Sequence, residues 1–162
     1  MHTRHLFGAL ALLALPLAAC TTSTGGGTGG TGATTESLCD ADPRAQSYAA
    51  GMSAATADGA LKVSFADASP APPGKGMNTW TIQVTDAQGK PVSGATVVLT
   101  PFMPDHGHGP STLPQVTPMA DAGMYQLSLI DLFMPGIWQN TFTITPASGP
   151  AGSVVFTFCV DG

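Results

Sequence analysis

The feature that most constrains the fold is a series of short segments in which apolar and polar residues alternate. Such alternation places one set of side chains on each face of a β-strand, and proline- or glycine-rich turns separate the segments. The six clearest segments are residues 61–65, 79–85, 97–99, 124–130, 138–144 and 154–160. Strands at this spacing, with little helical pattern between them, predict an all-β protein: an immunoglobulin-like antiparallel β-sandwich of six to seven strands.

The pattern also indicates which side chains face the core. Within one segment, the alternation places Tyr125, Leu127 and Leu129 on the same apolar face. Trp80 and Trp138 lie inside other segments and are expected in the core, because large aromatic side chains supply much of a core's apolar area.

The residues ahead of the first segment carry a weak helical pattern. Tyr48 and Met52 would lie on one side of a helix, although Gly51 between them weakens it. The pattern allows a short N-terminal helix. The predicted domain spans residues 37–162, which is long enough to bury a core of its own.

The first residues have the composition of a secretory leader. Arg4 precedes an apolar run that is too short to span a bilayer comfortably, and small residues follow it. The tetrapeptide Leu17-Ala18-Ala19-Cys20 resembles the lipobox of bacterial lipoproteins. That resemblance implies a signal peptide over residues 1–19, cleavage before Cys20 and acylation of this cysteine.

A flexible tether is expected after the lipid anchor. Apart from the cysteine, residues 20–36 are almost entirely Thr and Gly, and such a segment cannot bury enough apolar surface to offset the entropy of ordering. We therefore expect a protein of the bacterial cell envelope that is lipid-anchored at the outer membrane and faces the periplasm.

The charge of the chain restricts its partners. The sequence has five Lys and Arg and ten Asp and Glu, and Arg4 belongs to the leader, so the mature chain has a net charge of −6. Its basic residues do not cluster, whereas binding of nucleic-acid phosphates needs clustered Lys and Arg. The expected partners are the membrane, through Cys20, and an envelope protein, and nucleic acid is not expected.

Sequence patterns of catalysis are not evident. The chain has no G-x-S-x-G element, and its glycine-rich run lacks the lysine of a phosphate-binding loop. A pair of carboxylates for glycoside hydrolysis could come only from aspartates, and none is marked out by its neighbours. We therefore expect that the protein is not an enzyme.

Two cysteines remain if Cys20 is lipidated. Cys39 and Cys159 lie at the two ends of the predicted domain, and disulfides are permitted in an exported protein. A bridge between them would join the first segment of the domain to its last strand. The alternative is that both thiols are metal ligands.

The stretch MPDHGHG, residues 103–109, is the candidate metal site. His106 and His108 are two residues apart, so both imidazoles can lie on one side of an extended backbone. Imidazole suits copper and zinc, and the thioether of the nearby Met103 suits Cu(I). The same residues also fit an inert polar turn in which Asp105 bonds to nearby amides and the methionine fills a gap in the core.

A second Met-Pro element precedes a later strand. Met134 lies in LFMPGIW and is the expected fourth ligand, while Met119 and Met124 are weaker candidates for the same site. Asp105 is also a weaker candidate and would act as an additional ligand if the metal were Zn(II).

Five stretches carry a resemblance to the FixH/YtkA-like domain. They are WTIQVTD (80–86), GKPVSGA (89–95), MPDHGHG (103–109), GMY (123–125) and MPGIW (134–138). The resemblance covers most of residues 60–145. It implies an immunoglobulin-like sandwich in exported or membrane-bound proteins, and an association with copper handling and heavy-metal efflux. The Met-Pro-x-His element falls on Met103 and His106, and the Met-Pro-Gly-x-Trp element falls on Met134 and Trp138.

The leading hypothesis is therefore a periplasm-facing lipoprotein that binds a copper ion, Cu(I) in particular, and buffers it, delivers it or takes part in its efflux. Zinc is the second candidate ion. The alternative function is a non-catalytic structural or protein-interaction module of the envelope that binds no metal. The turn DAQGKPVSGA (86–95) supports this alternative, because it also resembles spacer and adhesin sandwich domains of bacterial surfaces.

Overall fold

The computed structural model describes residue 39 and residues 41–162 of the 162-residue chain. The predicted signal peptide, the predicted lipid anchor at Cys20 and the predicted tether lie outside the described residues. In the described part of the chain, no helical segment has the length and apolarity that crossing a bilayer requires.

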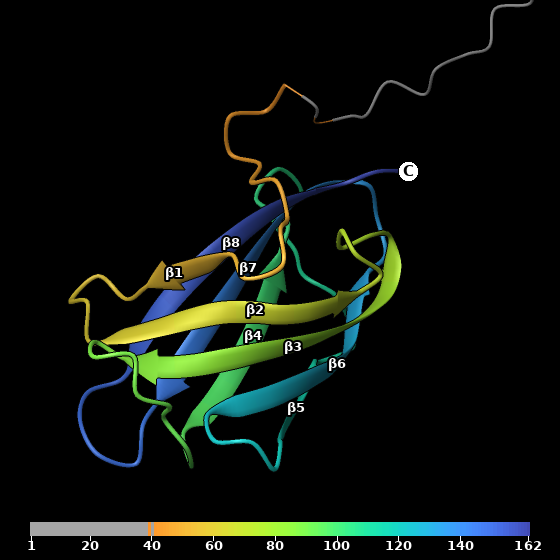
Figure 1. The fold of residues 1–162 in the computed structure, drawn as a ribbon. Coiled ribbons are helices and arrows are strands. Elements are labelled where there is room, and N and C mark those ends of the chain that lie inside the picture. The colour runs from red at the N-terminus through yellow and green to blue at the C-terminus, as the bar shows by residue number, and fades with distance from the viewer. Residues whose placement is uncertain (1–38, 40) are drawn as a thin grey trace, which may run out of the picture. The chain divides into compact units, whose positions relative to one another are not determined.

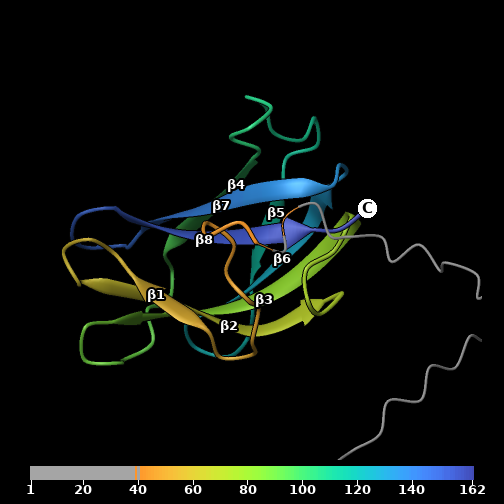
Figure 2. The same ribbon diagram turned by 90° about the horizontal axis from the view of Figure 1, so that it is seen from above.

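Eight antiparallel strands form two sheets that face each other (Figures 1 and 2). The strands are β1 (Ser53–Ala55), β2 (Leu61–Ser69), β3 (Gly76–Asp86), β4 (Thr96–Phe102), β5 (Gln115–Pro118), β6 (Met124–Leu132), β7 (Gly136–Thr145) and β8 (Gly152–Val160). One sheet has the order β1-β2-β3-β6-β5 and the other has the order β4-β7-β8. The predicted all-β, immunoglobulin-like sandwich is confirmed, with eight strands in place of six to seven.

The two strands that the sequence pattern missed are short and lie at the edges of the larger sheet. β1 has three residues, Ser-Ala-Ala, and pairs with β2. β5 has four residues and pairs with β6, where Val116 lies opposite Leu127. Neither is long enough to show a clear alternation of apolar and polar residues. Very short strands are common at the edges of sheets.

The N-terminal helix allowed by the sequence does not form in the described residues. The segment from Ala45 to Met52 contains no helix, turns at Ala50 and Gly51, and bonds to both sheets. The Gln46 amide donates to the Thr157 carbonyl of β8 (2.8 Å), and the Gly51 amide donates to the Phe65 carbonyl of β2 (2.8 Å). Gly51 has a φ of 83°, a left-handed conformation that suits a turn and interrupts a helix. Pairing with two strand edges therefore outweighs the weak helical pattern.

The core is an aromatic cluster centred on Phe65, which is fully buried. Its ring contacts Trp80 within its own sheet and rings of the opposite sheet, with centroids 5.0 Å apart for Phe156 and 5.9 Å for Phe142. These pairs are edge-to-face, the arrangement that the aromatic quadrupole favours. Trp80 and Trp138 are both fully buried, as the sequence predicted.

The predicted inward position of Leu129 is wrong. Tyr125 and Leu127 face the core, but Leu129 has a φ of 56° and is 40% exposed, while Ile130 and Leu132 are buried. The register between β3 and β6 shifts at the same place, between Asn78 and Trp80. An irregularity of this kind reverses the alternation of the strand, so that residues beyond it switch faces.

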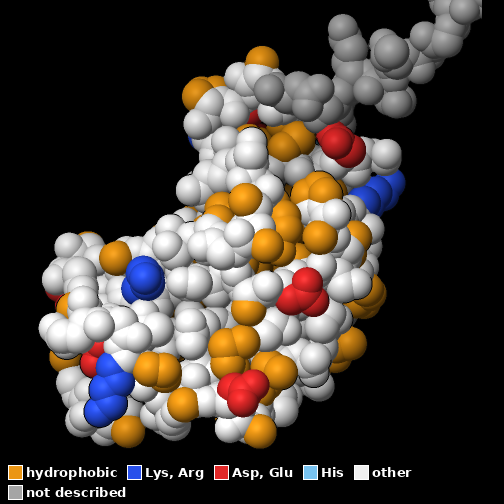
Figure 3. All heavy atoms as spheres, in the orientation of Figure 1, with side chains coloured by type: hydrophobic (Ala, Val, Ile, Leu, Met, Phe, Trp, Pro, Cys, Tyr) orange, Lys and Arg blue, Asp and Glu red, His pale blue; other side chains and the backbone are white. Residues whose placement is uncertain are grey.

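Charged side chains are sparse on the outer face of the larger sheet, where Lys and Arg do not merge into a patch (Figure 3). Strands β4, β7 and β8 contain no charged residue at all. The charged group that lies at the candidate site consists of Asp42, Arg44 and Asp105, and it is outside these three strands.

The predicted pairing of the two cysteines is confirmed. Cys39 and Cys159 form a disulfide with a Cα–Cα distance of 5.7 Å and a sequence separation of 120 residues. The bridge joins the start of the described chain to β8, the edge strand that the N-terminal segment also contacts. As cystine sulfurs, these atoms are not thiolate ligands for a metal.

We predict that the double variant C39S/C159S folds but is less stable. On the chain-entropy model, a cross-link that closes about 120 residues contributes roughly 5 kcal/mol. Urea unfolding followed by tryptophan fluorescence should show a midpoint well below that of the wild type. An unchanged midpoint would mean that the hydrogen bonds of the N-terminal segment suffice without the bridge.

Candidate metal site at the disulfide end

The two Met-Pro elements found in the sequence lie together at one end of the sandwich. One follows β4 and the other connects β6 to β7. The rings of His108 and Phe133 stack with centroids 5.7 Å apart and planes inclined by 24°. The methyl of Met103 lies so close to Gly136 that a Cβ there would be 3.0 Å from it. The sequence alone could not show whether the two Met-Pro elements meet, and the structure brings their loops into contact.

Backbone hydrogen bonds close the histidine loop into a tight turn. The Met103 amide donates to the His108 carbonyl (2.8 Å), and the Gly107 amide donates to the Met103 carbonyl (2.8 Å). Gly107 has a φ of 71°, which a glycine adopts without strain. Gly109 lies against β4, where a Cβ would meet the Pro101 carbonyl oxygen at 2.5 Å. The glycines thus permit the conformation that brings the two imidazoles together.

The separation of the two imidazoles fits a shared ion. The ring centroids of His106 and His108 are 5.7 Å apart and the planes are inclined by 60°. With a metal–nitrogen bond of about 2.0 Å, each ring centre lies roughly 3.2 Å from a bound ion. Two rings on one ion are then roughly 5.2 Å apart at a tetrahedral angle and about 6.4 Å apart in a linear arrangement. The observed distance lies between these limits.

His108 is the better positioned of the two. It is half-buried, and its Nδ1 lies 3.3 Å from the Gly109 carbonyl oxygen. If Nδ1 carries the proton and donates to that oxygen, Nε2 is left with its lone pair for a metal, an arrangement common among ligating histidines. Stacking on Phe133 further restricts the ring. His106 is exposed.

The two methionines of the predicted site pack in or against the core and are not exposed beside the histidines. Met103 is fully buried in the main core cluster. Met134 is partly buried and packs against the same cluster, and its carbonyl accepts a hydrogen bond from Trp138 Nε1 (2.9 Å). Core packing accounts for Met103, and its thioether is not exposed to a surface ion in this structure.

Met119 and Met124 do not belong to this site, which corrects the prediction that named them as weaker ligands. The Met119 amide donates to the Met124 carbonyl (2.9 Å) across the turn between β5 and β6. This turn is at the start of β6, whereas Phe133 follows the end of the same strand. Nine residues of strand separate the two ends by about 30 Å.

Asp105, the other weaker candidate, is already bound to a side chain. Its oxygens accept hydrogen bonds from Arg44 Nη1 (2.7 Å) and Nη2 (2.8 Å). The same guanidinium donates to Asp42 from Nε and Nη2. Hydrogen bonds from Arg44 hold the pKa of Asp105 below its ordinary value and lower the pKa of Asp42 to about 2. Both carboxylates are therefore ionised well into the acidic range.

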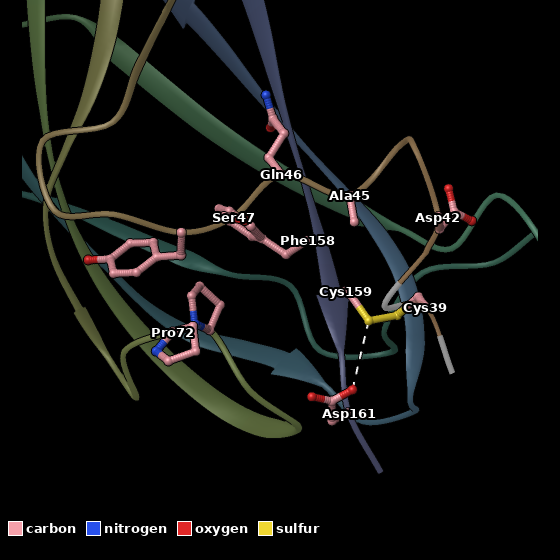
Figure 4. Close-up of a pocket in the computed structure, with 11 residues that line it drawn as sticks. Cys39, Asp42, Ala45, Gln46, Ser47, Pro72, Phe158, Cys159 and Asp161 are labelled. Carbon is pink, nitrogen blue, oxygen red and sulfur yellow. Dashed lines mark hydrogen bonds between the residues drawn. A yellow bond between two sulfur atoms is a disulfide. The ribbon is translucent and has the colours of Figure 1, made fainter. Parts of the chain in front are cut away.

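A shallow pocket of about 390 Å³ adjoins the disulfide (Figure 4). Its lining includes Tyr48, Pro72 and Phe158, and Asp161 places a carboxylate oxygen 3.8 Å from Cys159 Sγ. In the described residues, the two cysteines with Asp161 are the one group of three His, Cys, Asp or Glu side chains close enough to hold an ion. The disulfide removes both thiolates from that group, so we do not assign a metal to it.

Sequence reasoning missed Arg44. It is one of few basic residues, but it lies 61 positions from Asp105 and in a segment for which a helix was considered. Local sequence carries no signal for an ion pair at that separation. Only the path of the N-terminal segment along the sandwich brings the two residues together.

Comparison with known proteins gives one family. The YtkA-like family profile matches residues 57–143, from just before β2 into β7, and so includes both loops of the site. A DUF4426 family protein from Pseudomonas aeruginosa PAO1 has a similar structure, with a TM-score of 0.47 and 18% sequence identity. That similarity covers 64% of this chain and 92% of the other. No curated protein matches this chain in sequence.

Substitution of Met103 should separate its packing role from any ligand role. Met103→Ala should lower the free energy of unfolding by about 2–5 kcal/mol, because it opens a cavity in the core. Met103→Leu nearly conserves volume and should cost less than about 1.5 kcal/mol. Urea unfolding of the metal-free protein measures both values, and a Met103→Ala variant as stable as the wild type would contradict the packing role.

Proposed function

Because this chain belongs to the YtkA-like family, we propose that it is a non-catalytic copper-binding module of the bacterial envelope, with His106 and His108 as the metal-binding residues. It would be held to the membrane through lipidated Cys20 and would buffer copper, deliver it to an envelope protein or take part in its efflux. The resemblance to copper-handling proteins and the leader sequence support this proposal.

The observation that carries the proposal is the pairing of the two imidazoles. Their centroid distance of 5.7 Å suits two nitrogen ligands on one ion. The Gly109 carbonyl and the Phe133 ring orient His108 before any ion arrives. Such preorganisation reduces the entropy that is lost when the ion binds.

The available donors favour copper over zinc. Structural zinc sites use four ligands and catalytic sites use three protein ligands. In the described residues, no third His, Cys, Asp or Glu completes a cluster with the two histidines. Thioether sulfur favours Cu(I), and Met103 and Met134 pack in or against the core at the same end of the sandwich. A site of two imidazoles at the same end of the sandwich as two methionine thioethers therefore suits Cu(I).

The exposed setting suits exchange with a partner. His106 is exposed, and the site lies on a loop at the end of the sandwich, away from the packed faces of the sheets. An ion held there by few ligands can be passed to another protein by stepwise ligand replacement. A buffering or delivery role fits this arrangement better than a structural metal does.

We predict that the mature protein binds Cu(I) with micromolar or tighter affinity. In competition with a chromogenic Cu(I) chelator, His106→Ala and His108→Ala should each weaken binding at least about tenfold, because each removes one of two nitrogen ligands. Met119→Leu, a substitution at the opposite end of the sandwich, is the matched control and should bind as the wild type does. Equal affinity in the wild type and both histidine variants would refute the proposal.

A second candidate function is an interaction module that binds no metal. Apolar side chains are exposed around the same loops: Leu113 is 81% exposed, and Phe102 and Phe133 are each 39% exposed. Exposed apolar residues of this kind can contact a protein partner. Capture of an envelope protein that is equally strong with and without a chelator, together with a negative Cu(I) titration, would favour this candidate.

A further inference from the structure

Arg44 links the N-terminal segment to the histidine loop through a bidentate ion pair with Asp105. Both oxygens of Asp105 are engaged, one by Nη1 at 2.7 Å and the other by Nη2 at 2.8 Å. Such parallel hydrogen bonds fix the plane of the carboxylate as well as its position. Asp105 directly precedes His106 in the loop. The carboxylate thus adjoins a proposed ligand in the chain but is directed to Arg44.

Arg44 is itself held in place from several sides. Its amide and its Nε both donate to Asp42 Oδ1, at 2.9 and 3.0 Å. The Asp42 amide donates to the carbonyl of Cys39, which the disulfide ties to β8. On the other side, Gln46 makes two hydrogen bonds with Thr157. The guanidinium is therefore presented by a segment anchored before and after it.

The position of Asp105 matters because a carboxylate would change the character of the donor set. Two imidazoles alone, with thioethers in reserve, are nitrogen and sulfur donors that suit copper. Addition of a carboxylate oxygen gives a His₂Asp set, and carboxylate oxygen is among the ligands that zinc accepts readily. Whether Asp105 is free or engaged therefore bears directly on which ion the loop prefers.

We propose that Arg44 determines the metal specificity of this site by holding the Asp105 carboxylate away from the ion that His106 and His108 bind. The inference rests on the function proposed above and adds the reason why the site discriminates against Zn(II). Arg44 is a positioning residue, because it acts through Asp105 and does not touch the ion. It lies outside residues 57–143, the range matched by the family profile, whereas Asp105 lies within it. The restraint is therefore supplied by the part of the chain that precedes the family domain.

The test is the ratio of Zn(II) to Cu(I) affinity in Arg44→Gln, measured on the mature protein by competition with chelators for each ion. Release of Asp105 should strengthen Zn(II) binding roughly threefold to tenfold. The expected change is modest, because the exposed ion pair between Arg44 and Asp105 is weak and restrains the carboxylate only by a small free energy. Cu(I) affinity should stay within about twofold, since a carboxylate adds little for this soft ion. Thermal unfolding of each variant checks that the fold is retained.

Three further variants separate coordination from charge. Asp105→Asn alone should leave both affinities unchanged, because the carboxylate is not a ligand when Arg44 is present. R44Q/D105N should lose the gain in Zn(II) affinity. Lys90→Gln removes one positive charge in the turn after β3, at the opposite end of the sandwich, and should show no change in the ratio.

The outcomes distinguish this inference from the proposed function. If the wild type binds Cu(I) through the histidines but the Zn(II) to Cu(I) ratio of Arg44→Gln equals that of the wild type, the role of Arg44 is refuted and copper binding stands. Persistence of the gain in R44Q/D105N would also refute it. If neither the wild type nor Arg44→Gln binds either ion, both proposals fail.

Discussion

The N-terminal segment hydrogen-bonds to both sheets, and the organisation of the site depends on this interaction. Gln46 pairs with β8, and residues 51–55 pair with β2. A strand edge that is left open exposes unpaired amides and carbonyls. The segment covers two such edges, and the Cys39–Cys159 disulfide fixes its beginning. Arg44 can meet Asp105 only because the segment follows this path.

The aromatic core determines where the two loops of the site lie. Phe65 contacts rings from both sheets, so the sheets cannot slide relative to each other without loss of these contacts. β4 and β7 are paired so that Phe102 lies opposite Gln139. The loop after β4 and the loop before β7 must then lie at the same end of the sandwich. Met103 fills the space between them, where Gly136 leaves room for its methyl group.

Most strands could be predicted from the sequence, because successive residues of a half-buried strand face the core and the solvent in turn and therefore alternate between apolar and polar types. Prediction failed where that alternation was absent or interrupted. β1 and β5 are too short to show it, and the irregularity at Leu129 reverses it within one strand. The helical pattern near Tyr48 was overridden by pairing with strand edges, a tertiary effect that local propensity does not contain.

The sequence by itself determined the sandwich, the two cysteines that pair and the loop that carries both histidines of the predicted domain. Each of these is recorded in residues that are near one another or in residue types that are rare in the chain. The tertiary structure alone decided that Met103 is buried, that His108 stacks on Phe133, and that Met119 and Met124 lie at the other end. It also decided that Asp105 is bound by Arg44. These contacts join residues that are distant along the chain, and they exist only once packing of the two sheets has fixed where each loop lies.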